Sequence, residues 1–483
     1  NTGELMPINS FLYPGAKVPP PFTVANSIRL NQGDDPDMKK TIGAPTSNRK
    51  FSVSCWVKLS NLGVQRNLWG LGATSGATGL SVRFQDDDTL DFFDYNGSGN
   101  TFGYSTNQVF RDPSAWSHFL FAVDTEQSTA HNRVRIYHNG TEIEKTNLTD
   151  NPGDPSEDAN LTIADGHTFK VGDDNAGSNE WAGYIAEFVY IDGLQLTPSS
   201  FGQFNDDTPT IWEPIDVTGL TFGNNGFYLD FEDSSNLGND ANGGTDLTET
   251  NIASTDQSTD TCTNNFATFN SAQPALSNTS FSEGNLVAAT TSSASTQVPF
   301  ATTIPISTGK FYAEFKMIAK STTSGSIPYI GVLGAANFVS ELNNAYFVGG
   351  SNLDGVGYGA SGVVYSNGSE LDSSEASYDT NDIIGVAADI TNKKIYFSKN
   401  GTYINSGDPA AGSNGYTIPT TSQGFYIFAA SLYGASGSWG ANFGSPSFSI
   451  SSGNSDANGY GNFEYSVPSG YYALNTKNLA EFG

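Results

Sequence analysis

The feature that most constrains the fold of this sequence is a hairpin pattern that occurs twice. The segments "FAVDTEQSTAHNRVRIYHNGTEI" (121–143) and "IGVAADITNKKIYFSKNGTYI" (383–403) each run small apolar residues into an aspartate, cross a polar turn and return through Ile-Tyr to Asn-Gly-Thr. Alternation in the return segment places apolar side chains on one face, and Asn-Gly is a strong hairpin signal. The sequence therefore predicts antiparallel sheet in two separate parts of the chain.

Composition favours the same fold class throughout the chain. The sequence holds 53 Gly, 32 Phe and 22 Tyr but only three Met, a balance that suits pleated sheets joined by tight turns. No stretch of useful length repeats apolar residues at helical spacing. We predict an all-β protein, and 483 residues exceed the size at which one hydrophobic core usually stops growing, so we expect two domains.

Strand-like segments separated by turn signals form two groups, which we assign to domains at 25–231 and 300–483. Residues 232–299 between them hold few large apolar residues and many turn formers, so we predict a polar linker and connecting segment. Residues 1–24 include the triplet "PPP", and because proline cannot donate to a sheet ladder we predict an extended, Pro-rich N-terminal arm.

Both groups carry a family likeness. The motifs "RKFSVSCWVKLSNLG", "RVRIYHNGTEI" and "WAGYIAEFVYIDGLQLTPSSFG" resemble the laminin-G-like, concanavalin-A-like domain. Residues 310–476, with "GKFYAEFKM", "IGVAADITNKKIYFSKNG", "WGANFG" and "YYALNTKNL", resemble a SPRY domain. The resemblance implies two antiparallel β-sandwiches of jelly-roll type. The order of the two domains is similar to that of capsid- or tail-fibre-like virion proteins of marine tailed phages.

The net charge of the chain limits the classes of partner that it can bind. The chain carries 50 acidic and 21 basic residues, a formal net charge of −29. Such a charge repels phosphates and anionic lipid surfaces, so we expect no nucleic-acid partner. No apolar run approaches the roughly 20 residues that cross a bilayer, so we also expect no membrane insertion.

Spacings typical of catalysis are mostly missing. Laminarinase-type hydrolases of the concanavalin-like fold place their acids on alternate positions of one strand, and the nearest candidate here is "EFVYID", from Glu187 to Asp192. Those two residues are five apart, so in a regular strand they face opposite sides. The four histidines fit no metal-binding spacing. We therefore predict that the protein is not an enzyme.

Acidic clusters offer the oxygen ligands that Ca²⁺ prefers. Of two such clusters, "VGDDNAGSNEW" is the better candidate because laminin-G-like domains sometimes hold calcium at a loop on the sandwich rim, and Asp173 and Asp174 are the residues singled out. The spacing matches no diagnostic calcium loop. A Ca²⁺ site and a solvated acidic turn therefore both stay open.

Aromatic residues in loops provide candidate sugar-stacking surfaces, since a flat apolar face with a polar handle suits a pyranose ring. Four tyrosines lie in Gly- and Ser-rich segments of the second domain, where SPRY domains commonly place their binding loops. They are Tyr346, Tyr358, Tyr365 and Tyr433. Ligand binding and plain packing are both consistent with these positions.

Together these features predict a non-enzymatic protein of the virion surface or its fibres that binds host-surface glycans or receptors. The arm would contact other virion proteins, and a homo-oligomer is expected. One alternative is a structural protein that decorates a capsid or fibre and binds only virion partners. The other is a glycoside hydrolase of concanavalin-like fold.

Overall fold

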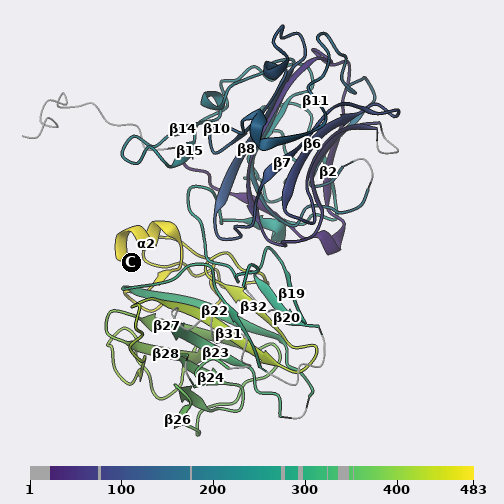
Figure 1. Cartoon of the computed structure of the whole chain (residues 1–483). Helices are drawn as coiled ribbons and strands as arrows, with labels where there is room; N and C mark the ends of the chain where they lie inside the picture. Colours follow the sequence, from purple (N-terminus) through teal and green to yellow (C-terminus); the bar gives the residue numbers. More distant parts are fainter. Residues whose placement is uncertain are drawn as a thin grey trace, which may run out of the picture.

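The computed structural model describes residues 22–73, 78–174, 177–273, 278–291, 297–323, 325–334, 347–351 and 353–483. Figure 1 shows two bodies built from β-strands, with the helix α2 (Thr476–Phe482) near the boundary between them. Almost all strand pairs are antiparallel, so the prediction of an all-β fold with two antiparallel sandwiches is confirmed. Among the described residues, no helix has the length and apolarity needed to span a bilayer.

The first sandwich is made of two eight-stranded sheets. One, which we call the groove sheet, has the order β11-β7-β6-β5-β4-β12-β2-β17. The other, which we call the joint sheet, has the order β10-β9-β8-β3-β13-β1-β18, with β16 paired to β13. The groove-sheet strands are β2 (Asp37–Thr41), β4 (Arg66–Gly72), β5 (Gly79–Phe84), β6 (Thr89–Tyr95), β7 (Asn100–Val109), β11 (Leu148–Gly153), β12 (Thr168–Val171) and β17 (Thr248–Thr250). The joint-sheet strands are β1 (Ser27–Leu30), β3 (Lys50–Leu59), β8 (Trp116–Asp124), β9 (Val134–His138), β10 (Thr141–Glu142), β13 (Gly183–Asp192), β16 (Phe227–Leu229) and β18 (Gln257–Ser258).

Alternate residues of these strands build the core between the two sheets. Leu90 and Phe92 of β6 point inward with Phe51 and Val53 of β3, and all four are fully buried. Trp69 lies at the centre and stacks on Phe169 with ring centroids 5.6 Å apart. The two-residue period of a strand therefore leaves the other residues of β6 on the outer face of the groove sheet.

The second sandwich pairs a nine-stranded sheet with a six-stranded one. Their orders are β19-β20-β32-β22-β27-β28-β29, with β30 on β28 and β33 on β22, and β21-β31-β23-β24-β25-β26. The strands of the larger sheet are β19 (Thr279–Ser282), β20 (Val287–Thr290), β22 (Lys310–Ala319), β27 (Ile383–Asp389), β28 (Lys394–Lys399), β29 (Thr402–Tyr403), β30 (Tyr416–Thr417), β32 (Ser438–Asn442) and β33 (Tyr472–Ala473). Those of the smaller are β21 (Gln297–Ala301), β23 (Tyr329–Gly334), β24 (Val356–Gly359), β25 (Val364–Ser366), β26 (Ser369–Asp372) and β31 (Tyr426–Tyr433). A short pair, β14 (Gly202–Phe204) and β15 (Trp212–Pro214), lies outside both sandwiches.

The hairpin pattern that occurs twice in the sequence forms the same local structure in both sandwiches. It makes the hairpins β8–β9 and β27–β28, and each return strand ends in an Asn-Gly pair with positive φ at both residues, Asn139-Gly140 and Asn400-Gly401. The Asn139 side chain accepts a hydrogen bond from the backbone N–H of His118 (2.8 Å), and the Asn400 side chain accepts one from that of Ile383 (2.8 Å). The sequence prediction of antiparallel hairpins in both parts of the chain is confirmed, and in each part the Asn-Gly turn joins the return strand to the next short strand, β10 or β29.

The segment 232–299, predicted as a polar linker and connecting segment, contributes strands to both sandwiches. Its strands β17 and β18 add to the edges of the first sandwich, and β19, β20 and β21 belong to the second. Short edge strands need backbone hydrogen bonds more than apolar side chains, so a polar composition does not prevent pairing. A few buried side chains, such as Leu247 and Phe269, supply its contacts with the two cores.

A buried ion pair joins the two sandwiches at the end of β3. The Lys58 ammonium donates to Asp260 Oδ2 (2.7 Å), Asn265 Oδ1 (2.7 Å) and the Phe266 carbonyl (2.8 Å), and both charged side chains are only 1% exposed. Phe266 packs against Tyr312 and Phe463 of the second sandwich. Lys58 therefore holds the first segment of the second domain against the first domain.

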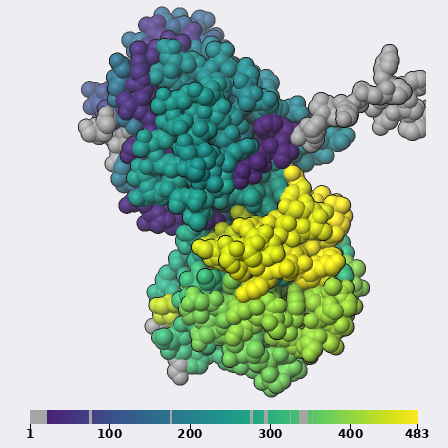
Figure 2. Space-filling view, turned by 180° about the vertical axis from the view of Figure 1, so that it is seen from behind, coloured from purple at the N-terminus to yellow at the C-terminus, as the bar shows by residue number. Residues whose placement is uncertain are grey.

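The C-terminal part of the chain lies along the same boundary. Asn265 N–H donates to Thr476 Oγ1 (3.0 Å), and Phe266 forms a β-bridge with Asn475. Figure 2 shows this yellow segment packed between the two bodies. The joint thus includes residues that are far apart in the sequence.

We expect Asp260→Asn to lower the free energy of unfolding by about 3–5 kcal/mol, because the Lys58 charge would stay buried without a counter-charge. Urea-induced unfolding followed by tryptophan fluorescence measures the change. The control is Lys50→Met, whose partner Glu126 lies 2.6 Å away at the surface (29% and 41% exposed). The control should change stability little, because water screens an exposed pair. Equal losses in the two variants would contradict this role for Lys58.

Candidate functional site

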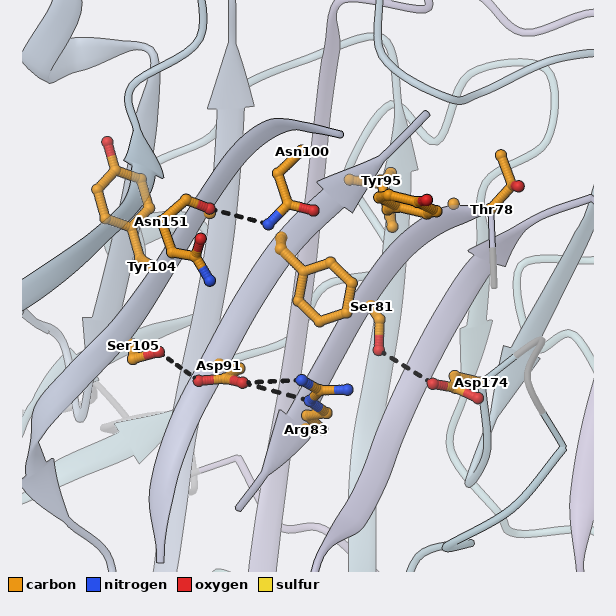
Figure 3. A pocket seen from close by; sticks show the side chains of 14 residues that line it. Thr78, Ser81, Arg83, Asp91, Tyr95, Asn100, Tyr104, Ser105, Asn151 and Asp174 are labelled. Carbon is orange, nitrogen blue, oxygen red and sulfur yellow. Dashed lines mark hydrogen bonds and ion pairs between the residues drawn. The ribbon is translucent and has the colours of Figure 1, made fainter. Parts of the chain in front are cut away.

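The outer face of the groove sheet holds a groove of about 280 Å³. It runs over β5, β6, β7 and the end of β11, and the loop after β12 closes one side (Figure 3). Its polar lining side chains are Thr78, Ser81, Arg83, Asp91, Asn100, Ser105, Asn151 and Asp174, and its aromatic ones are Phe93, Tyr95 and Tyr104. Several strands of one rigid sheet therefore position the side chains of this groove.

A charged network forms the floor of the groove. Arg83 donates through Nε (3.3 Å) and Nη2 (3.2 Å) to Asp91 Oδ2. Ser105 Oγ donates to Asp91 Oδ1 (2.6 Å), and Gln85 also donates to the Asp91 carboxylate. Figure 3 shows Arg83, Asp91 and Ser105 side by side. The charges of Arg83 and Asp91 thus offset each other within the floor.

Aromatic rings stand on the same face as this network. Asp91, Phe93 and Tyr95 occupy alternate positions of β6, so all three side chains face the groove, and both rings are half-buried. The Arg83 guanidinium lies 4.9 Å from the centroid of the Phe93 ring, which fixes the orientation of both groups. The groove therefore offers flat apolar surface beside hydrogen-bonding groups.

Of the two acids named as calcium candidates, Asp174 lies at one side of this groove and Asp173 precedes it in the chain. Asp173 is buried, and its Oδ2 accepts a hydrogen bond from the Lys170 ammonium (2.7 Å), which supplies positive charge where a cation would sit. Asp174 lines the groove and accepts a hydrogen bond from Ser81 Oγ (3.4 Å). Within the described residues no group of three or more His, Cys, Asp or Glu could hold a metal ion. Calcium binding here stays a prediction.

The structure does not bring the candidate tyrosines together. Tyr346 lies outside the described residues. Tyr358 is fully buried in the second core and donates to the Ala376 carbonyl, so its ring has no face open to a ligand. Tyr365 is half-buried on the opposite side of the sheet, 5.2 Å from the Phe347 ring, and Tyr433 is half-buried at the end of β31. Alternation within the strands β24 and β25 explains why Tyr358 and Tyr365 face opposite sides.

Sequence reasoning missed Arg83, Phe93 and Tyr95. The signal was present in "TLDFFDY" (89–95), where an acid and two aromatic rings occupy the positions between the core residues. The acids Asp86, Asp87, Asp88, Asp91 and Asp94 form the second of the two acidic clusters in the sequence, but they separate in the structure. Asp88 pairs with Arg111 (2.9 Å), whereas Asp94 is buried on the inner face and accepts from the Thr162 backbone N–H (3.2 Å).

Glu187 and Asp192, the pair weighed as hydrolytic acids, do not share a cleft. Glu187 sits at a bulge in β13 with φ of 49°, is 6% exposed and accepts a hydrogen bond from the Tyr228 hydroxyl (2.7 Å). Asp192 accepts instead from the backbone N–H of Thr46 (2.9 Å) and the side chain of Asn225 (2.9 Å). Glu187 therefore ties strand β16 to β13, whereas Asp192 ties loop residues to β13. Burial raises the pKa of Glu187 to about 7.

Residues 34–199 match the model of the concanavalin A-like lectin/glucanases superfamily, and residues 314–438 match that of the SPRY domain. The chain contains both domains. The concanavalin A-like match spans the strands of the groove, and the SPRY match spans most of the second sandwich. A search of curated proteins found no match.

Solved structures that are similar in fold include three of different origin. The SPRY domain of human HERC1 is 16% identical, with a TM-score of 0.25, and the match covers 32% of this chain and 87% of that one. A heptameric SAP-like pentraxin from Limulus polyphemus is 17% identical (TM-score 0.27; 36% and 80% covered). Domain 4 of AbnA, a GH43 extracellular arabinanase from Geobacillus stearothermophilus, in complex with arabinotriose, is 22% identical (TM-score 0.24; 32% and 64% covered).

The raised pKa of Glu187 predicts a pH-dependent stability. Because the folded-state pKa (about 7) exceeds the ordinary value of 4.5, the folded protein favours the neutral carboxyl, and its stabilising contribution is lost as pH rises from about 4.5 to 7. Glu187→Gln keeps an acceptor for Tyr228 but carries no charge. We expect this variant to melt at a higher temperature than the wild type at about pH 8 and at a similar temperature at about pH 4.

Thermal melts of both proteins at the two pH values measure this difference. The control is Glu126→Gln, because hydrogen bonding to Lys50 lowers the pKa of that exposed acid, so its removal should not raise the melting temperature at about pH 8. A Glu187→Gln variant less stable than the wild type at the higher pH would contradict the raised pKa of this buried carboxyl.

Proposed function

We propose that this protein binds neutral glycans in the groove of its first sandwich. The observation that carries the proposal is the alternation of Asp91, Phe93 and Tyr95 on β6, which places two aromatic faces beside a fixed carboxylate on one open surface. A sugar ring presents an apolar face and equatorial hydroxyls, so it can stack on such rings and bond to the polar groups around them. The match to the concanavalin A-like lectin/glucanases superfamily supports a binding role for this domain.

Charge favours a neutral ligand over an acidic one. The charge of Arg83 is offset by Asp91, and Asp174 adds a carboxylate at the side of the groove. The net charge of −29 repels polyanions at longer range. A sulfated or uronic-acid-rich glycan would meet repulsion here, and among the described residues that line the groove no free cation offsets it.

The hydrogen bonds of Asp91 favour binding over hydrolysis. Glycoside hydrolysis needs one carboxylic acid that delivers a proton and a second carboxylate beside it. Arg83, Gln85 and Ser105 all donate to Asp91, so its carboxylate oxygens already accept hydrogen bonds from the floor of the groove. The groove therefore supports recognition of a glycan better than its cleavage.

For the biological setting, we propose a virion surface or fibre protein that uses this groove on host-surface glycans. Support comes from the resemblance of the two-domain order to fibre-like proteins of marine tailed phages and from the Pro-rich arm, whose residues 1–21 lie outside the described ones. In this setting the arm contacts other virion proteins and the protein forms a homo-oligomer. Antibody labelling of intact virions tests it, and the absence of label from purified particles would contradict it.

We expect Phe93→Ala to weaken glycan binding roughly tenfold, equivalent to about 1.4 kcal/mol, because the variant loses a stacking face. Isothermal titration with laminarihexaose, cellohexaose, maltohexaose and xylohexaose measures the affinity, with an oligogalacturonate as the acidic comparison. Phe425→Ala is the control, because Phe425 is also partly exposed (45%) but lies in the second sandwich.

The proposal predicts that at least one neutral oligosaccharide binds the wild type and the control alike, and that the oligogalacturonate does not. Binding that Phe93→Ala leaves unchanged would contradict the assignment of the groove. Failure of every neutral oligosaccharide to bind would contradict the neutral-glycan function itself.

A further inference from the structure

A second groove, of about 460 Å³, lies between the two sandwiches. Asn26 and Arg29, from the start of the first domain, and the stretch from Ser254 to Thr259 form one wall. Glu283 and the loop 445–450 of the second sandwich form the other. This groove is separate from the one on the groove sheet, because the two share no lining residue.

Direct contacts between the domains fix the walls. Arg29 Nη1 donates to the Pro446 carbonyl (2.9 Å), and the hydroxyls of Ser258 and Ser445 lie 2.7 Å apart. The Tyr184 hydroxyl also donates to the Gly284 carbonyl (3.0 Å), and Gly284 is next in sequence to the wall residue Glu283. Because the walls are already ordered, a ligand that binds here loses little affinity to ordering of the protein.

The surface of the groove alternates hydrogen-bonding groups with apolar ones. Exposed hydroxyl and amide side chains come from both domains, namely Ser254, Thr255, Thr259, Ser449 and Asn462. Phe448 and Ile450 supply half-buried apolar surface between them. The Lys316 ammonium lies 5.6 Å from the Phe448 ring centroid and helps to hold that ring in place.

Arg29 and Glu283, the charged side chains that line this groove, offset each other. The Arg29 guanidinium donates to the carbonyls of Pro446 and Thr255 and lies 3.5 Å from the Glu283 carboxylate. Only 4% of the Arg29 side chain is exposed, so it presents no free cation for an anionic ligand. Burial raises the pKa of Glu283, which agrees with a groove that disfavours added charge.

We propose that the groove between the sandwiches is a second saccharide site, which takes a short neutral oligosaccharide across both domains. The combination of a fixed apolar ring, hydroxyl and amide groups on two walls and internally offset charge suits the same ligand chemistry as the first groove. The inference rests on the proposed function only for the class of ligand. It assigns binding of the oligosaccharide to residues other than those of the first groove.

Hydrogen–deuterium exchange of the full chain with each of the four neutral hexasaccharides tests the second site. The proposal predicts slower exchange at 254–259 and 445–450 with at least one of them, in the wild type and in Phe93→Ala. Phe448→Ala should lose this protection and weaken binding at this site by roughly tenfold. Ser449→Trp, at an exposed position, fills the groove and should give the same loss even where Phe448→Ala perturbs folding.

The pattern of protection shows which of the two sites binds sugar. Protection at 91–95 and 151 without protection at 254–259 and 445–450 would overturn the second site and leave the proposed function standing. Protection at the second groove alone would support this inference and overturn the first groove. Protection at neither groove with all four sugars would overturn both. Protection at 254–259 that persists in Phe448→Ala and Ser449→Trp would also overturn the assignment of the second site.

Discussion

The arrangement of the two sandwiches depends on the buried Lys58–Asp260 ion pair. Taking two charges out of water is costly unless each finds several hydrogen bonds. All three Lys58 N–H groups have acceptors, and Asp260 Oδ1 accepts from the Trp116 indole (2.9 Å) and from the backbone N–H of Phe266 (3.2 Å). Removing either partner would leave an uncompensated buried charge. The intact ion pair therefore holds the segment 260–266 in one position. The neighbouring contacts of Arg29 then hold the walls of the second groove.

The alternation of side chains along each strand explains where the proposed binding surface lies on the first sandwich. Each groove-sheet strand gives alternate positions to the core and the remaining positions to the outer face. On β6 that outer face carries Asp91, Phe93 and Tyr95, and the ion pair with Arg83 fixes their surroundings. A binding surface built on a rigid sheet needs little reordering when a ligand arrives. The buried acid Glu187 plays a different part, because it links β13 to the neighbouring strand β16 of the joint sheet through Tyr228.

Much of the fold could be predicted from local patterns. The two Asn-Gly hairpins were recognised because turn type and strand alternation are encoded within about twenty residues. The strands within 232–299 were missed, because their pairing partners β1, β2 and β32 lie far away in the sequence and edge strands need few apolar residues. Tyr358 could not be separated from Tyr365, because Gly-rich context conceals which face of a strand is buried. The groove was missed because Arg83 and Asp91 meet only when β5 and β6 pair.

The most direct test of the central claim is a crystal structure of the full chain with the neutral hexasaccharide that binds most tightly. The account predicts sugar density over Phe93 and Tyr95, with hydroxyls hydrogen-bonded to the polar groups around Asp91. It also predicts that Lys58 and Asp260 keep their contact in the complex. Sugar bound elsewhere with the groove of the first sandwich vacant, or no neutral sugar bound at any concentration used, would contradict the account.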